Sequence, residues 1–169
     1  MKNIVLIGFM GSGKSTVGKL LARQLNFQLV DTDELIEKKT GKQIKKIFED
    51  EGEEAFRLLE SEVVSEVVDA ENQVIACGGG VILNSKNVQA LKKNGLLVYL
   101  KAFASILFER SRGTNDRPLL NVVNPKEKVH ELLKARESLY EKIADIVVDT
   151  SNINVNEVVE KIREKLNER

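Results

Sequence analysis

The chain of 169 residues has one cysteine, one histidine and no tryptophan. Its single thiol, Cys77, excludes an intramolecular disulfide and a cysteine-rich zinc site, and it suits a reducing compartment. One histidine leaves little room for a histidine-based metal site or catalytic triad. Aromatic residues make up 5% of the chain, which is too few for platforms on which nucleic-acid bases stack.

An excess of charge of either sign is also absent, since 26 Lys and Arg balance 26 Asp and Glu. A basic excess is the usual mark of nucleic-acid binding, so we expect no nucleic-acid partner. We expect no membrane partner either, because no apolar run approaches the roughly 18–20 residues that span a bilayer. The apolar stretch that begins at Ile4 runs into Gly8 and lacks a signal-peptide cleavage site. We therefore expect a cytoplasmic protein. We also expect a monomer.

Apolar runs rich in β-branched residues alternate with longer amphipathic segments. The runs lack period-2 alternation, which is typical of parallel strands buried on both faces. The predicted strands are residues 4–7, 27–30, 74–76, 96–100 and 146–148. The predicted helices are residues 14–25, 33–39, 43–51, 53–68, 85–93, 104–110, 126–142 and 155–166. Gly95 is expected to be the left-handed residue that ends the helix at 85–93.

No linker, repeat or low-complexity tract divides the chain, so residues 1–169 are predicted to form a single α/β domain. Its architecture would be a parallel sheet of about five strands with helices on both faces. One stretch, 112–124, is irregular and polar. It is either a lid over the site or an ordinary surface loop.

The segment 8–15 reads GFMGSGKS and matches the pattern G-x-x-x-x-G-K-[ST] in full, between a predicted strand and a predicted helix. Its glycines let backbone N–H groups converge on phosphates, and the helix adds its positive end. Lys14 would reach the β- and γ-phosphates, and the Ser15 hydroxyl would bind Mg²⁺. The segment therefore predicts a nucleoside triphosphate site.

The pattern alone does not choose between a kinase, a GTPase and a motor ATPase. A GTPase reads guanine with an N-K-x-D motif, and the chain has no Asn-Lys dipeptide. An oligomeric ATPase usually needs a larger domain and a strand that ends in paired acids. The small size and the lid candidate favour a kinase that acts on a small molecule.

Two acids, Asp31 and Asp33, follow the second predicted strand, where side chains face the ligand crevice of a parallel sheet. One could serve Mg²⁺ and the other a substrate hydroxyl. The alternative is a helix cap, with Asp31 or Thr32 at the first position. The spacing leaves both interpretations open.

Arg136 falls on the apolar stripe of its predicted helix, and Arg57 shares a helix sector with Val64 and Val68. Two inward arginines suit bidentate capture of a carboxylate. The alternative for each is an ion pair with an acid of the protein.

Gly78, Gly79 and Gly80 directly follow the third predicted strand. A substrate can lie against such a backbone and bind its N–H groups, and the alternative is a flexible turn. Arg117, in the irregular stretch, could stabilise charge on a transferred phosphoryl group. Its alternative is a solvated loop arginine.

In their order along essentially the whole chain, these motifs resemble those of the shikimate kinase family. They are GFMGSGKST at 8–16, DTD at 31–33, FR at 56–57, GGGVI at 78–82, RPLL at 117–120 and R-x-x-x-Y at 136–140. The resemblance implies the three-layer P-loop fold of the nucleoside-monophosphate-kinase-like proteins. The implied reaction is the Mg²⁺-dependent transfer of the ATP γ-phosphoryl group to the 3-hydroxyl of shikimate. This is a step toward chorismate and the aromatic amino acids.

The resemblance also implies residue roles, with Lys14, Asp33 and Arg117 as catalytic residues. The residues implied to bind ATP are Gly11, Ser12, Gly13, Lys14, Ser15, Thr16, Arg110 and Arg117. Those implied to bind shikimate are Asp33, Arg57, Gly78, Gly79, Gly80 and Arg136. Ser15 would bind the metal ion, and Asp31 would act on it through water. Arg110 is expected to stack on adenine, although Arg112 is close enough to compete.

Cys77 departs from the family, which often has Ser or Thr before the triple glycine. The change removes at most a minor hydrogen bond, and we expect a buried, inert thiol. Two other functions stay open. One is a P-loop kinase for gluconate or a nucleoside monophosphate, which does not require the two inward arginines together with the triple glycine. The other is a non-catalytic P-loop regulatory module, which the intact Lys14, Ser15, Asp33 and Arg117 disfavour.

Overall fold

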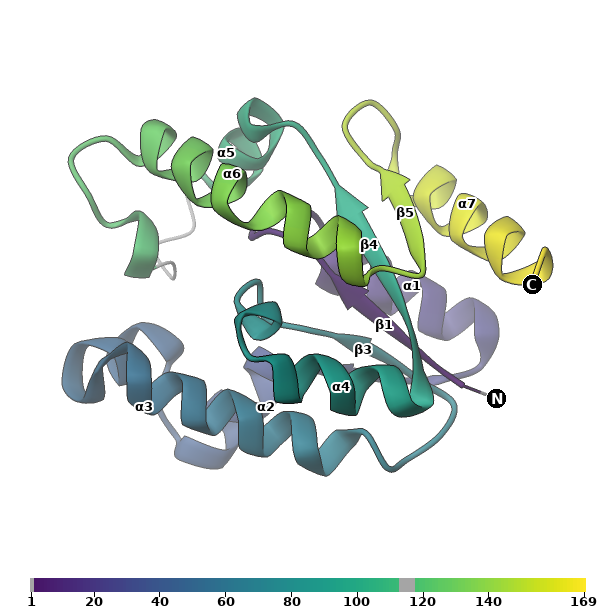
Figure 1. Ribbon diagram of the computed structural model, residues 1–169, viewed down its shortest axis with the longest axis horizontal. Helices are drawn as coiled ribbons and strands as arrows, with labels where there is room; N and C mark the ends of the chain where they lie inside the picture. The colour runs from purple at the N-terminus through teal and green to yellow at the C-terminus, as the bar shows by residue number, and fades with distance from the viewer. Residues whose placement is uncertain (1, 113–117) are drawn as a thin grey trace.

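The computed structural model describes residues 2–112 and 118–169. Its five strands form one sheet in the order β2-β3-β1-β4-β5 (Figure 1). The strands are β1 (Asn3–Ile7), β2 (Gln28–Asp31), β3 (Gln73–Ala76), β4 (Gly95–Lys101) and β5 (Ile146–Asp149). All four neighbouring pairs are parallel. The predicted five-stranded parallel sheet is thus confirmed.

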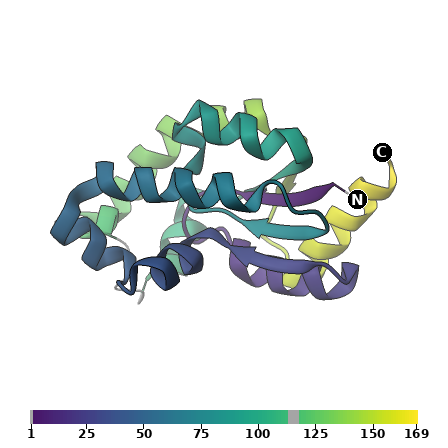
Figure 2. The same ribbon diagram turned by 90° about the horizontal axis from the view of Figure 1, so that it is seen from below.

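Helices cover both faces of the sheet, as Figure 2 shows. Helices α1 (Lys14–Leu25) and α7 (Val155–Asn167) lie on one face. Helices α3 (Ile44–Val67), α4 (Ser85–Asn94) and α6 (Pro125–Ile143) lie on the other. The shorter α2 (Thr32–Thr40) packs on α3, and α5 (Ala104–Ser111) packs on α6. Two 3-10 turns, η1 (Val81–Leu83) and η2 (Pro118–Leu120), complete the elements of the described residues.

Strand β1 shows why the strand sequences are continuously apolar. Its residues Val5 and Ile7 belong to the core under α3, α4 and α6, whereas Ile4 and Leu6 belong to the core under α1 and α7. Successive side chains of a strand point to opposite faces, so a strand between two helical layers favours apolar residues at successive positions. All five residues of β1 are buried.

Two glycines mark where the local predictions succeed and fail. The predicted helices 43–51 and 53–68 form α3, and the chain leaves the helical conformation at Gly52, between them, where φ is 85°. The prediction that Gly95 is left-handed is wrong, because its φ is −133°, which is extended. Gly95 is the first residue of β4. A Cβ at Gly95 would press on the Val5 side chain and the Leu91 carbonyl, so close packing is the reason for a glycine there.

The carboxyl ends of the strands collect the predicted site residues at one edge of the sheet. Strand β1 leads into the phosphate loop, β2 ends at Asp31, and β3 leads into the triple glycine. A third apolar cluster, which includes Phe9, Leu107 and Val129, joins the phosphate loop to α5 and α6. Within the described residues, no helix combines the length and the apolar character that crossing a membrane requires.

Candidate functional site

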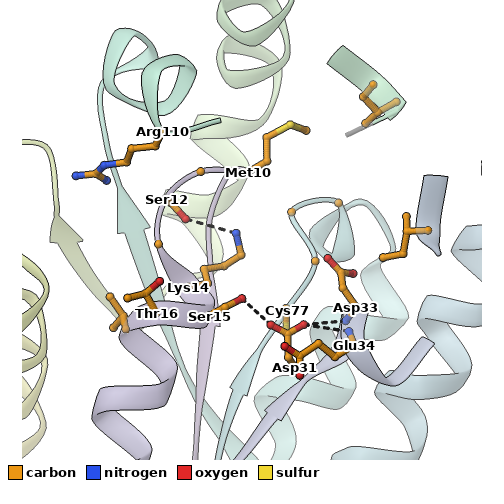
Figure 3. A pocket seen from close by; sticks show the side chains of 18 of the residues that line it. Met10, Ser12, Lys14, Ser15, Thr16, Asp31, Asp33, Glu34, Cys77 and Arg110 are labelled. Atoms are coloured by element: carbon orange, nitrogen blue, oxygen red, sulfur yellow. Dashed lines mark hydrogen bonds between the residues drawn. The ribbon is translucent and has the colours of Figure 1, made fainter. Parts of the chain in front are cut away.

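A cavity of about 850 Å³ opens at this edge of the sheet (Figure 3). Its walls come from the phosphate loop, from the β2–α2 junction, from α3 and from the glycine turn at 78–80. Pro118, Leu119, Arg136 and the loop after β5 complete the lining. Segments far apart in the sequence therefore meet around one space large enough for two small ligands.

The phosphate loop adopts the conformation that its glycines allow. Gly11 and Gly13 have φ angles of 80° and 92°, which residues with a Cβ rarely adopt. The ammonium of Lys14 donates to the carbonyl oxygens of Gly8 and Phe9, both at 2.9 Å, and to Ser12 Oγ at 3.4 Å. Lys14 is thus folded along the loop that leads into α1 (Figure 3).

Asp31 combines the two roles that the spacing left open. Its Oδ1 caps α2 by accepting from the N–H groups of Asp33 and Glu34, at 3.0 and 3.3 Å. Its Oδ2 accepts from the Ser15 hydroxyl at 2.6 Å. A hydroxyl and a carboxylate beside a phosphate loop are the hard oxygen donors that Mg²⁺ prefers, with water and phosphate oxygens completing its shell. Among the described residues no group of three acids, histidines or cysteines gathers as an all-protein metal cage.

Asp33 and Glu60 place two unsatisfied oxygens over the same glycine. A Cβ at Gly78 would lie 2.8 Å from Asp33 Oδ1 and 2.8 Å from Glu60 Oε1. Within the described residues, both oxygens are buried and accept no hydrogen bond. Buried acceptors usually have a partner, so this pair is suited to the polar groups of a ligand.

Burial sets the charge state of both acids. It raises the pKa of Asp33 to about 6, with the Asp31 charge adding to the effect and the Lys14 and Arg57 charges opposing it. Burial likewise raises the pKa of Glu60 to about 7, against the Arg57 ion pair. Each carboxyl therefore changes protonation near neutral pH, as a proton-accepting group requires.

Arg57 makes the internal ion pairs that the sequence left as its alternative. Its Nη1 donates to Glu60 Oε2 at 2.9 Å, and its Nη2 donates to Glu53 Oε1 at 3.2 Å. Its Nε is buried and, within the described residues, has no acceptor. The guanidinium lies against Gly80, where a Cβ would collide with it. The glycine at position 80 therefore makes room for Arg57.

Arg136 lies where its helix pattern predicts. It is 6% exposed, and it shares the buried stripe of α6 with Val129, Leu133 and Tyr140. Among the described residues, no carboxylate lies within ion-pair distance of it. A buried cation that lines a cavity without an ion-pair partner is suited to an anionic ligand.

The structure distinguishes Arg110 from Arg112, the two candidates for stacking on adenine. Arg110 lines the cavity and donates to Thr150 Oγ1 at 3.1 Å and to the Thr150 carbonyl at 2.8 Å. Arg112 is exposed and pairs with Glu109.

The prediction for Arg117 lies outside the described residues, as does the 113–117 part of the lid candidate. Cys77 is buried as expected, and burial raises the pKa of its thiol.

Glu60 is the site residue that the sequence reasoning missed. Its signal was nevertheless present in the helix pattern. The buried residues of the second half of α3 are Phe56, Glu60, Val63, Val64 and Val67. An acid on the apolar stripe of a helix is the same anomaly that drew attention to Arg136, with the opposite charge.

The raised pKa of Asp33 predicts that Asp33→Asn stabilises the fold above neutral pH. The folded state disfavours the ionised carboxyl, so its destabilising effect grows as pH rises from about 4, the pKa of an unfolded chain, to about 6. Removing the charge should raise the melting temperature at pH 8 and change it little at pH 4. Thermal unfolding at both pH values measures this. Asp69→Asn is a control on the surface, and a larger gain at pH 4 would contradict the prediction.

The comparisons with known proteins agree with one another. A family model described as shikimate kinase matches residues 10–167. A shikimate kinase of Thermodesulfovibrio yellowstonii is 51% identical over 162 residues, which cover 96% of this chain and 93% of that protein. A shikimate kinase of Caldanaerobacter subterraneus is 47% identical over 162 residues, with 96% and 94% covered.

A solved structure extends the similarity to three dimensions. Shikimate kinase from Acinetobacter baumannii, in complex with shikimate, superposes with a TM-score of 0.97 at 39% identity. The match covers 99% of this chain and 94% of that one. Sequence and fold therefore point to the same family.

Proposed function

We propose that this chain, which belongs to the shikimate kinase family, transfers the γ-phosphoryl group of ATP to the 3-hydroxyl of shikimate. The observation that carries the proposal is the cavity itself. It joins a phosphate loop to a buried acid, Asp33, and to two inward arginines, Arg57 and Arg136. The phosphate loop suits a triphosphate. The acid and the two arginines suit an acceptor that has both a hydroxyl and a carboxylate.

ATP would lie along the phosphate loop. The N–H groups of residues 11–16 would hold its phosphates, and Lys14 would move from its carbonyl acceptors to the β- and γ-phosphates. Arg110 would contact the adenine, since it lines the cavity and Arg112 does not. Arg117 would stabilise charge on the transferred group.

Mg²⁺ fits the oxygen pair at the foot of the phosphate loop. The Ser15 hydroxyl would bind the ion directly, and Asp31 would hold it through water. When bound, the ion would neutralise negative charge on the phosphates. The capping bonds from α2 hold Asp31 in place for this role.

Shikimate would occupy the space between the glycine turn and the arginines. Arg57 and Arg136 would bind its carboxylate, and residues 78–80 would offer the backbone against which its ring lies. Asp33, whose Oδ1 has no protein partner among the described residues, would accept a hydrogen bond from the 3-hydroxyl.

Phosphoryl transfer depends mainly on positioning and on charge stabilisation. The bond between the γ-phosphorus and the bridging oxygen of ADP breaks as the bond to the 3-oxygen forms. The hydroxyl proton passes late to Asp33, which is a suitable acceptor because its pKa is about 6.

The proposal includes the predictions of a single domain over residues 1–169 and of a monomer in the cytoplasm.

A parallel assay of acceptors tests this function directly. ADP release is measured with shikimate, gluconate, AMP or no acceptor at the same ATP and Mg²⁺ concentrations. We expect turnover with shikimate alone. Turnover with gluconate or AMP instead would identify another metabolite kinase, and no turnover with any acceptor would favour the regulatory module.

Arg136→Ala should raise the KM for shikimate. Losing a charged hydrogen bond to a bound carboxylate costs about 1.5–3 kcal/mol, or roughly 10- to 100-fold in affinity. The kcat should change much less, because the interaction is already made in the ground state. Steady-state kinetics measure both constants. Arg163→Ala, on the exposed side of α7, is the matched control, and an unchanged KM in the Arg136 variant would contradict the carboxylate assignment.

Asp33→Asn should lower kcat by about 10²- to 10⁴-fold, the usual contribution of a positioned proton acceptor. In the wild type, kcat/KM should fall as pH drops through about 6–7, where Asp33 and Glu60 take up protons as a coupled pair. The pH profile should lose or shift this acid limb in the variant. A near-normal rate would show that Asp33 neither accepts the proton nor orients the hydroxyl.

A further inference from the structure

The glycine turn after β3 is held in place by hydroxyl groups from two other elements. Thr32 Oγ1 accepts from the Gly78 N–H at 3.1 Å. The Tyr140 hydroxyl donates to the Gly79 carbonyl at 2.5 Å. Both side chains are completely buried, since Thr32 and Tyr140 are each 0% exposed. Hydrogen bonds made away from water hold their partners firmly.

Tyr140 is itself held rigidly and lies beside Arg136. Its ring stacks on Tyr99 of β4, with centroids 4.8 Å apart and planes at 15°. On α6 it follows Arg136 by four residues, so the two side chains share one face. Burial raises the pKa of the phenol, and the Arg136 charge opposes that effect. The phenol therefore contacts the glycine turn and shares the buried face of α6 with the arginine.

Fixing the Gly79 carbonyl also fixes the next N–H group. In a trans peptide the C=O and the following N–H point in opposite directions, and the described residues contain no cis peptide. The bond to Tyr140 therefore determines where the Gly80 N–H points. Glycine has no side chain to restrain its backbone, so an external hydrogen bond has an unusually large influence here.

The neighbours of the turn show what a rotated peptide would disturb. A Cβ at Gly79 would lie 3.4 Å from the Gly8 carbonyl and the Met10 N–H of the phosphate loop. Gly80 lies against the Arg57 guanidinium. The turn thus lies between the phosphate loop and Arg57, and a rotated peptide would disturb both.

We propose that Tyr140 is a positioning residue of the acceptor site. Its hydroxyl fixes the Gly79 carbonyl, and its stacked ring lies on the same buried face of α6 as Arg136. Tyr140 thereby keeps the glycine turn and the arginine in the arrangement that binds the acceptor. The inference rests on the proposed function, because the acceptor is shikimate. Tyr140 touches no reacting atom, so its removal affects acceptor binding more than the chemical step.

Tyr140→Phe is the direct test, since it removes the hydroxyl and keeps the stacked ring. A neutral hydrogen bond contributes about 0.5–1.5 kcal/mol, so the KM for shikimate should rise about 3- to 10-fold. The kcat and the KM for ATP should stay within about twofold of the wild type. Tyr99→Phe is the matched control, because it removes the same atom from the other ring of the stack. Its KM for shikimate should stay at the wild-type value.

A double-mutant cycle tests whether Tyr140 acts through Arg136. If the two residues act as a unit, Tyr140→Phe should weaken shikimate binding much less in the Arg136→Ala background than in the wild type. Dissociation constants from calorimetry give the coupling. Fully additive effects would overturn the inference.

A spectroscopic measurement leaves the Tyr140 hydroxyl in place. The chain has two tyrosines and no tryptophan, so Tyr99→Phe leaves Tyr140 as its only tyrosine. Adding shikimate to that protein should perturb the near-ultraviolet tyrosine absorption, because a carboxylate arrives at the arginine beside the phenol. An unperturbed spectrum at saturating shikimate would overturn the inference.

The outcomes separate this inference from the proposed function. Wild-type turnover with shikimate, together with an unchanged KM in Tyr140→Phe, overturns the positioning role alone. Equal increases of KM for shikimate and ATP also overturn it, since they indicate a general structural defect. A wild type that does not use shikimate overturns the proposed function and this inference together.

Discussion

Five parallel strands end at one edge of the sheet, and the site is built at that edge. The strands stay there because helices cover both faces, so that residues such as Val5 and Leu6 are buried on opposite sides of the same strand. With both faces occupied, loops at the carboxyl ends are the natural place for a ligand. The phosphate loop, Asp31 and the glycine turn are all such loops or loop boundaries. The site is therefore a consequence of strand direction as much as of any one residue.

Charge in the site is concentrated in a way that the neutral total conceals. Lys14, Arg57 and Arg136 line the same cavity as Asp33 and Glu60. Burial opposes ionisation of both acids. The Lys14 and Arg57 charges favour ionisation of Asp33, and the Arg57 charge favours ionisation of Glu60. Ionised Asp33 and Glu60 therefore lower the stability of the folded protein. An anionic ligand with hydroxyl groups would supply hydrogen-bond partners for these acids and for the arginines. The expected stabilisation by Asp33→Asn expresses that compromise between stability and function.

Sequence reasoning reached most of the fold and most of the site. Continuous apolar runs indicated the parallel sheet, and the stripe pattern placed Arg136 inside. The prediction for Gly95 was wrong because a glycine after a helix can either end the helix in the left-handed conformation or allow close packing. The packing of Val5 and Leu91 against Gly95 cannot be read from the sequence. Sequence reasoning missed Glu60, although the same stripe pattern marks that residue as an anomaly. It also left open whether Asp31 caps a helix or faces Ser15, and the two carboxylate oxygens do both.

The sequence by itself determined the phosphate loop, the order of the motifs and the family, because these are properties of neighbouring residues and their spacing. Only the tertiary structure decided which side chains meet. Glu60 pairs with Arg57 one turn away. From α3, Glu60 also reaches Gly78, beside Asp33, and Arg57 reaches Gly80. The Tyr140 hydroxyl reaches a glycine 61 residues earlier in the chain. Such contacts depend on how α3 and α6 pack against the sheet, and packing is set by the whole core rather than by any local pattern.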